Sequence, residues 1–311
     1  MHADPARSDF GSIRASDAWG DADQHFPNLL VTSAPFRERL EGEVSTKGAP
    51  LCIGLDPDPS KLPKSLGDGI GAVRQHTLAI VEATAPVAAA YKPNLAFFER
   101  LGAAGIELLI EVVRVAGQHA LVIADAKRGD IGNTARAYAE ALFDVIGADA
   151  CTVNGYLGHD SLVPFLERPD RFAFIVCRTS NPGAADIQDL VVNPGSEPLY
   201  LHLARRAVEW NGSGTVGLVA GATWPAEIAQ IREVAPDLPL LLPGVGSQGA
   251  DLSQAVKAAM GKAGAGRYLI NVSRAISQAS IGDDFAEAAG HAAQRFRDQI
   301  REVSSAVAKS G

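Results

Sequence analysis

The sequence lacks the features that mark membrane-spanning, secreted and metal-binding proteins. No apolar run approaches the ~18 residues that cross a bilayer, and no basic region followed by an apolar core opens the chain, so neither a membrane span nor a secretory signal is expected. No pair of histidines stands at ligand spacing and no Cys-x-x-Cys occurs, which argues against a transition-metal site. The net charge of −8 argues against non-specific binding to nucleic acid, which needs a basic surface.

Cysteine is also scarce. The three cysteines, Cys52, Cys151 and Cys177, each lie inside an apolar run. They are most simply interpreted as small buried hydrophobic residues of a protein in the reducing cytoplasm. A nucleophilic cysteine would need a base and an electropositive setting, and the sequence displays neither.

The size and composition of the chain fit a soluble globular protein. It has 311 residues, of which 47% are hydrophobic and 21% charged. Length alone favours two domains, but an α/β barrel holds about 250 residues as a single domain.

Eight apolar runs alternate with amphipathic stretches, which predicts a single (β/α)₈ TIM barrel of the α/β class with an N-terminal extension. Runs that are apolar throughout are typical of parallel strands covered by helices. A doubly wound open sheet is the rival, but Gly54–Pro59 after the first strand is not its glycine fingerprint. The expected strands are 51–56, 88–94, 120–127, 150–154, 172–178, 216–222, 238–245 and 267–273. The expected helices include 105–117, 134–146, 199–210, 226–234 and 284–303.

Three segments fall outside this repeat. Residues 1–32 are polar, mixed in charge and without periodicity, so we expect a disordered leader or an irregular cap before a barrel domain at 33–311. The stretch 34–44 is helical in pattern, with Pro35 suited to a first turn, and is expected to cover the bottom of the barrel. The segment 179–198 is long and rich in Gly, Pro, Asn and Asp, which favours an active-site lid over a simple surface excursion.

The segment Asp125–Asp130 concentrates charge at the end of an apolar strand. Alternate strand residues share a face, so Asp125 and Lys127 are expected to point the same way, with Asp130 just beyond. A structural ion pair is one interpretation, although exposed pairs add only about 0–1 kcal/mol and buried charges are costly unless paired. The other is an enzyme, in which the neighbours hold the lysine charged and a carboxylate repels an anionic group of the substrate.

Polar residues follow the ends of seven of the eight strands, and in a barrel these ends share one face, where such enzymes keep their active sites. Lys92 could simply reach solvent, or it could join Asp125, Lys127 and Asp130 in an alternating charged network that needs no metal. The strand-end residues are Asp56, Lys92, Asn94, Asp125 to Asp130, Asn154, Thr179, Ser180, Gln248 and Arg274.

A phosphate site is predicted after the last two strands. The turn that holds Gly244 and Gly246 can expose backbone N–H groups, and Ser273–Arg274 adds a guanidinium. Barrels often bind phosphate at this position. Taken singly, the glycines could form a tight turn and the arginine a surface salt bridge.

These motifs together resemble those of orotidine 5′-phosphate decarboxylases, and the extended form with Lys-Arg-Gly-Asp-Ile-Gly is similar to the longer bacterial group of that family. The resemblance covers about residues 36–303 and leaves out the leader. It rests on 125–134, Gly54–Pro57, Tyr91–Asn94, Thr179–Gly183, Pro243–Gly249 and Ser273–Arg274, in the family's order.

The resemblance implies a role for each site residue. Lys127 would donate the proton to C6 of the pyrimidine, Asp125 would face the departing carboxylate, and Lys92 and Asp130 would complete the network. Asp130 and Thr134 would reach in from the neighbouring subunit of a homodimer. The implied substrate contacts are Asp56 and Thr134 to the ribose, Ser180 and Asn154 to the pyrimidine, Gln248 to ring and phosphate, and Arg274 with the Gly244, Gly246 and Ser273 turns to the phosphate.

The implied reaction needs no cofactor, because a fixed ammonium can stabilise and then protonate a C6 carbanion. Three rivals share parts of the pattern. A sugar-phosphate decarboxylase has an Asp-x-Lys pair but needs magnesium ligands, and a pentulose-phosphate epimerase would need histidines at strand ends. A non-catalytic nucleotide-binding barrel would have no use for the full charged set.

Overall fold

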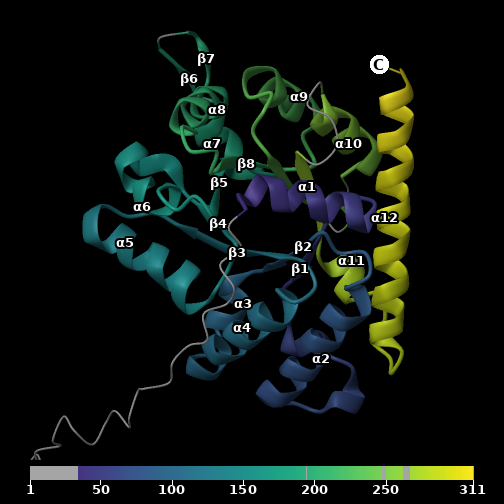
Figure 1. The fold of residues 1–311 in the computed structure, drawn as a ribbon. Coiled ribbons are helices and arrows are strands. Elements are labelled where there is room, and N and C mark those ends of the chain that lie inside the picture. Colours follow the sequence, from purple (N-terminus) through teal and green to yellow (C-terminus); the bar gives the residue numbers. More distant parts are fainter. Residues whose placement is uncertain (1–33, 194, 247–249, 262–266, 311) are drawn as a thin grey trace, which may run out of the picture. The chain divides into compact units, whose positions relative to one another are not determined.

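The computed structural model describes residues 34–193, 195–246, 250–261 and 267–310. Eight parallel strands close into a barrel in the order β1-β10-β9-β8-β5-β4-β3-β2, which confirms the (β/α)₈ prediction (Figure 1). The expected leader, residues 1–32, lies outside the described residues. The barrel strands are β1 Leu51–Leu55, β2 Ala90–Pro93, β3 Leu121–Arg128, β4 Ala150–Val153, β5 Phe172–Arg178, β8 Val216–Ala220, β9 Leu240–Pro243 and β10 Tyr268–Val272.

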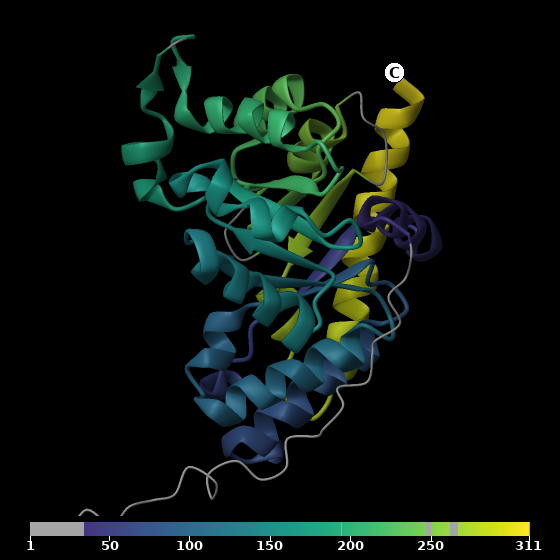
Figure 2. The ribbon, with the colours of Figure 1, turned by 60° about the vertical axis from the view of Figure 1, so that its left-hand side comes forward.

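Helices surround the barrel, as the two views show (Figures 1 and 2). Most predicted helices are confirmed to within a few residues, but the last one continues to Ser310 instead of ending at 303. Two long helices, α2 and α10, were not among those predicted. The helices are α1 Phe36–Lys47, α2 Gly69–Thr84, α3 Leu95–Glu99, α4 Ala103–Ala116, α5 Gly132–Glu140 with a π turn at Ala141–Val145, α6 Val163–Leu166, α7 Ala185–Gln188, α8 Leu199–Trp210, α9 Pro225–Val234, α10 Leu252–Met260, α11 Arg274–Ser277 and α12 Phe285–Ser310.

Helix α1 closes the N-terminal end of the barrel, as its pattern predicts. Phe36 is buried among the inward-facing residues of the strands, and its ring stacks on Phe172 with centroids 4.6 Å apart. Arg39 fixes the helix from outside the barrel, since its guanidinium donates to Asp149 at 2.5 Å and to the Asp170 carbonyl at 2.9 Å. The floor is therefore a packed aromatic layer.

The opposite, C-terminal end is where the strand pairing becomes irregular. The register between β3 and β4 shifts between Ala124 and Arg128, and that between β5 and β8 shifts between Val176 and Arg178. Bulges re-aim side chains and are common beside active sites. Both irregularities fall where the sequence places its polar residues.

The segment 179–198 has secondary structure of its own and contacts α8. It contains a 3₁₀ turn at Pro182–Ala184, helix α7 and the antiparallel pair β6 Val191–Val192 and β7 Glu197–Pro198, at the top left of Figure 1. Gln188 holds its base, because its side-chain oxygen accepts the Thr179 N–H at 2.8 Å. Arg178 donates to the same oxygen at 3.2 Å and to Asp189 at 3.2 Å.

Candidate active site

Three charged side chains meet at the mouth of the barrel. Lys92, in β2, places Nζ 2.7 Å from Asp125 Oδ2, and Lys127, in β3, places Nζ 2.5 Å from Asp125 Oδ1. The side chains of Lys92 and Asp125 are only 5% and 9% exposed, whereas that of Lys127 is 51% exposed. One buried carboxylate is thus shared by a buried ammonium and an accessible one.

The network fixes the charge of its buried members. Burial alone would raise the pKa of Asp125, but the charges of Lys92 and Lys127 and their hydrogen bonds outweigh it and hold the pKa well below its usual range. Burial alone would lower the pKa of Lys92, but the carboxylates of Asp125 and Asp56 outweigh it and raise the pKa above its usual range. Asp125 is therefore a carboxylate and Lys92 an ammonium throughout the neutral range.

The depressed pKa of Asp125 predicts a loss of stability in acid. Below about pH 4 an unfolded aspartate takes up a proton that the native Asp125 does not, so the stability that depends on this carboxylate falls as the pH falls toward the native pKa. Denaturant titrations at about pH 5 and pH 3 should show a larger loss for the wild type than for Asp125→Asn. Equal losses in the two proteins would contradict the assigned pKa direction.

The contact between Asp125 and Lys127 does not come from regular strand alternation. Lys127 has φ +48°, in the left-handed region that a side chain disfavours, and it lies inside the register shift of β3. The Lys127 N–H donates to Thr152 Oγ1 of β4 at 2.9 Å. The two side chains do meet, as predicted, but the bulge and not strand alternation brings them into contact.

A cavity of about 240 Å³ opens over this network. Lys92, Asp125, Lys127 and Ser180 all line it, so the structure brings four of the predicted site residues together. Apolar walls from Val176, Val219 and Leu241 adjoin the charges. Two lining residues, Thr152 and Arg178, were not predicted as site residues. Arg178 had a sequence signal, as a charged residue at the end of an apolar strand, and Thr152 had none.

Asp56 and Ser273 meet across the junction of β1 and β10. Ser273 Oγ donates to Asp56 Oδ2 at 2.5 Å, while the buried Asp56 Oδ1 has no hydrogen-bond partner among the described residues. Gly54 is required beneath this pair, because a Cβ there would lie 2.6 Å from Ser273 Cβ.

The predicted phosphate site is only partly described. Gly244 and Gly246 have φ of 113° and 87°, and a Cβ on Gly246 would lie 2.8 Å from Ala275 Cβ. Glycine is therefore needed at this turn, as its pattern suggests. Arg274 is exposed at the first position of α11. Gln248 lies outside the described residues.

Three predicted residues stand apart from the network within one chain. Asp130 Oδ1 accepts the Ile131 N–H at 2.7 Å and Thr134 is exposed on α5. Asn154 caps the short turn Gly155–Leu157, accepting the Tyr156 N–H at 3.1 Å. The single chain therefore does not bring Asp130 to Lys92 or Lys127.

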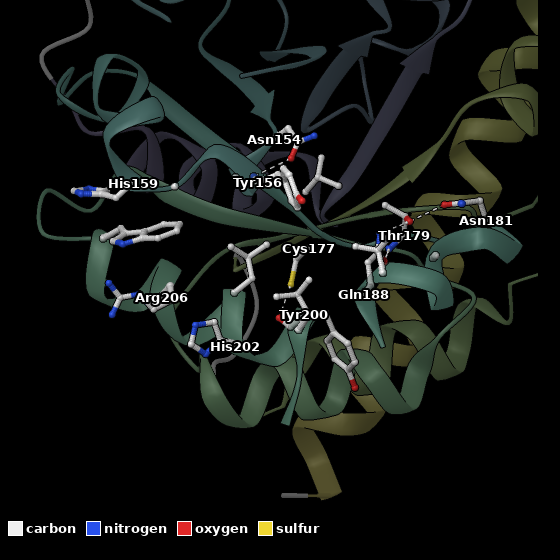
Figure 3. A pocket seen from close by; sticks show the side chains of 18 of the residues that line it. Asn154, Tyr156, His159, Cys177, Thr179, Asn181, Gln188, Tyr200, His202 and Arg206 are labelled. Atoms are coloured by element: carbon white, nitrogen blue, oxygen red, sulfur yellow. Dashed lines mark hydrogen bonds between the residues drawn. The ribbon is translucent and has the colours of Figure 1, made fainter. Parts of the chain in front are cut away.

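A second cavity, of about 710 Å³, lies between Asn154–His159, the base of the 179–198 segment and α8 (Figure 3). Tyr200, His202 and Arg206 line it from α8. Thr179 and Asn181 line both cavities. The 179–198 segment thus forms a wall between the candidate active site and this larger groove.

Burial raises the pKa of the Cys52 and Cys177 thiols to about 12, which fits their interpretation as hydrophobic residues. The described residues contain no group of three or more His, Cys, Asp or Glu side chains that could hold a metal ion. Among the helices of the described residues, none is long and apolar enough to span a membrane.

Comparison with known proteins decides the family. Residues 49–289 match the model of the family described as "Orotidine 5'-phosphate decarboxylase / HUMPS family". A protein named orotidine 5′-phosphate decarboxylase from Thermomicrobium roseum is 49% identical over 274 residues, which cover 88% of this chain and 97% of that protein. The chain belongs to the orotidine 5′-phosphate decarboxylase family.

Other members agree in sequence and in fold. An orotidine 5′-phosphate decarboxylase from Herpetosiphon aurantiacus is 49% identical over 262 residues, 84% of this chain and 96% of that one. The structure of Leishmania donovani OMP decarboxylase is 39% identical with a TM-score of 0.75, covering 86% of this chain and 100% of that chain. The Leishmania donovani UMP synthase structure has a TM-score of 0.79 and 39% identity, over 87% of this chain and 56% of that chain. Membership of the longer bacterial group of decarboxylases stays a prediction.

Proposed function

We propose that this chain converts orotidine 5′-phosphate to uridine 5′-phosphate and CO₂, as a carboxy-lyase of pyrimidine synthesis. The observation that carries the proposal is the carboxylate of Asp125, which is shared by Lys92 and Lys127. All three residues line a cavity in a barrel of the decarboxylase family. Decarboxylation at C6 leaves a carbanion with no ring carbonyl placed to delocalise it. A fixed positive charge beside C6 meets that need.

The two lysines differ in side-chain exposure, and we assign them different roles on that basis. Lys127 is 51% exposed and lines the cavity, so its ammonium can stabilise the carbanion and then transfer a proton to C6. Lys92 is buried and serves to keep Asp125 ionised. Asp125, beside the carboxylate of the substrate, is relieved of a like charge when CO₂ leaves.

The remaining residues are assigned to the nucleotide. We assign Asp56 to a ribose hydroxyl, Ser180 and Asn154 to the pyrimidine, and Gln248 to ring and phosphate. The turn with Gly244 and Gly246, together with Ser273 and Arg274, is assigned to the phosphate. The position of Ser180 on the cavity wall supports its assignment.

Arg274→Ala should weaken binding through the phosphate. The guanidinium forms a two-pronged contact with a phosphate dianion, and the phosphate lies far from the reacting carbon. The Michaelis constant for orotidine 5′-phosphate should rise about 10–100-fold, by analogy with a loss of roughly 1.5–3 kcal/mol for a charged hydrogen bond. Activity on the phosphate-free nucleoside, orotidine, should stay within about twofold. An equal loss on both substrates would contradict the assignment.

We also propose that the protein acts as a homodimer in the cytoplasm, with Asp130 and Thr134 completing the site of the partner subunit. Asp130 is half-buried and Thr134 is exposed, and Ile131, the neighbour of Asp130 in sequence, is an apolar residue that is 59% exposed and that a partner would cover. Within this arrangement residues 33–311 form the catalytic domain, and the 179–198 segment, hinged at Arg178 and Gln188, acts as the lid.

The test is the ultraviolet absorbance of orotidine 5′-phosphate incubated with purified protein and EDTA. A fall in substrate absorbance, with uridine 5′-phosphate and CO₂ appearing, is the expected result. Absorbance that falls only when magnesium is restored would move the function toward a metal-dependent sugar-phosphate relative. Tight binding without turnover would instead indicate a nucleotide-binding protein.

A further inference from the structure

Thr152, a buried residue of β4, connects the two residues that the proposed reaction depends on. The Lys127 N–H donates to Thr152 Oγ1 at 2.9 Å, and Thr152 Oγ1 donates to Asp125 Oδ1 at 3.0 Å. A hydroxyl carries one proton, so the direction of both bonds is fixed: the amide donates to the hydroxyl and the hydroxyl to the carboxylate. The single hydroxyl proton of Thr152 is therefore taken up by its hydrogen bond to Asp125.

The bond to Lys127 acts at an unfavourable backbone conformation. A side-chain-bearing residue at φ +48° is strained and persists only where its surroundings impose it. The pairing of β3 with β4 is interrupted between Ala124 and Arg128, and the Thr152 hydroxyl takes the Lys127 N–H there. The Thr152 hydroxyl thus accepts the hydrogen bond that a main-chain carbonyl of β4 would accept in regular strand pairing.

The bond to Asp125 acts on the other partner of the same ion pair. Asp125 Oδ1 accepts from Lys127 Nζ at 2.5 Å and from Thr152 at 3.0 Å, while Oδ2 accepts from Lys92 at 2.7 Å. Thr152 consequently fixes the carboxylate that receives Lys127 and the main chain from which Lys127 projects.

We propose that Thr152 is a positioning residue for decarboxylation, whose hydroxyl sets the Lys127 ammonium at the reacting carbon by holding its main chain and its counter-ion together. The inference rests on the proposed function. It assigns Thr152 no contact with the substrate: the residue acts through Lys127 and Asp125.

The test replaces the hydroxyl and nothing else. Thr152→Val keeps the branched shape and should lower kcat about 10–100-fold, because a misplacement on the ångström scale costs up to about 10² in rate. The KM for orotidine 5′-phosphate should change less than about threefold, since the ribose and phosphate contacts remain. Thr152→Ser restores the hydroxyl and should bring kcat back to within about threefold of the wild type.

Thr215→Val is the matched control. Thr215 is equally buried and its hydroxyl donates to the Leu166 carbonyl at 2.9 Å, at the start of β8 and away from the cavity. It should lower the unfolding temperature as Thr152→Val does, with kcat within about twofold of the wild type. A normal kcat in Thr152→Val, or a serine variant as slow as the valine variant, would overturn the inference while the proposed function stands. A wild type that releases no CO₂ would overturn both.

Discussion

Lys127→Ala should abolish turnover and leave the fold intact. In the proposed mechanism the substitution removes the group that would both stabilise the C6 carbanion and protonate it, so the rate should fall by at least about 10⁴-fold. The side chain is half exposed, and Asp125 retains its bonds to Lys92 and Thr152. The unfolding transition should therefore change little, and uridine 5′-phosphate should still bind.

The measurement is single-turnover CO₂ release, with calorimetric binding of uridine 5′-phosphate and a thermal unfolding curve on the same preparation. Lys257→Ala, at an exposed lysine on the outer helix α10, is the matched control and should keep wild-type activity. Substantial CO₂ release by Lys127→Ala protein, free of any contaminating decarboxylase, would refute the role of Lys127 as proton donor.

Mixing two inactive variants should restore activity if the site is shared between subunits. Asp130→Ala and Lys127→Ala should each be inactive, because each homodimer lacks one member of the network at both sites. A mixed dimer holds one site with neither residue and one intact site. After full exchange at equal amounts, activity should recover to about a quarter of the wild-type value.

The recovery is checked by assaying the mixture before and after subunit exchange, which differently tagged chains make measurable by co-purification. Asp298→Ala, a surface aspartate of α12 paired with Arg301, is the control and should be active alone. Co-purified mixed dimers that stay inactive would disprove the shared site. Asp130 would then act, if at all, within its own chain.

The barrel could be predicted because its strands carry the signal in their own composition. Every residue of β1, β4, β8 and β10 is buried, and apart from Thr152 and Asn271 these strands are apolar, so they stand out from the helices between them. Helix α2 was not among the helices named from the sequence, and its buried face includes polar side chains. Thr77 and Thr84 hide there because their hydroxyls donate to the Val73 and Ile80 carbonyls one turn earlier, at 2.8 and 2.7 Å.

The charged residues of the site could be predicted from the sequence, but the residues that hold them in position could not. Lys92 and Asp125 stand out as charged residues in apolar strands, and parity puts Lys127 on the same face. Thr152 gives no such contrast, since threonine is common in strands and its importance comes from a register shift that only the fold shows. Arg178 was expected only as a strand end, and its ties to Gln188 and Asp189 depend on how the following segment folds back.

The position of Asp130 marks another limit. Spacing from Asp125 predicts membership of one charged cluster, yet in the single chain the Asp130 carboxylate bonds to the Ile131 N–H. Sequence distance alone does not say which copy of a chain a side chain serves. The mixing experiment tests directly whether Asp130 serves its own chain or the partner subunit.

The aromatic floor formed by Phe36 and Phe172 also limits the route by which the substrate enters and the products leave. Because α1 closes that end of the barrel, the cavity formed by the described residues opens only at the other end, beside the 179–198 segment. In the proposed reaction, carbon dioxide would form next to Asp125 and would have to leave through the same opening as the nucleotide. Movement of one loop would then time the entry of the substrate and the exit of both products.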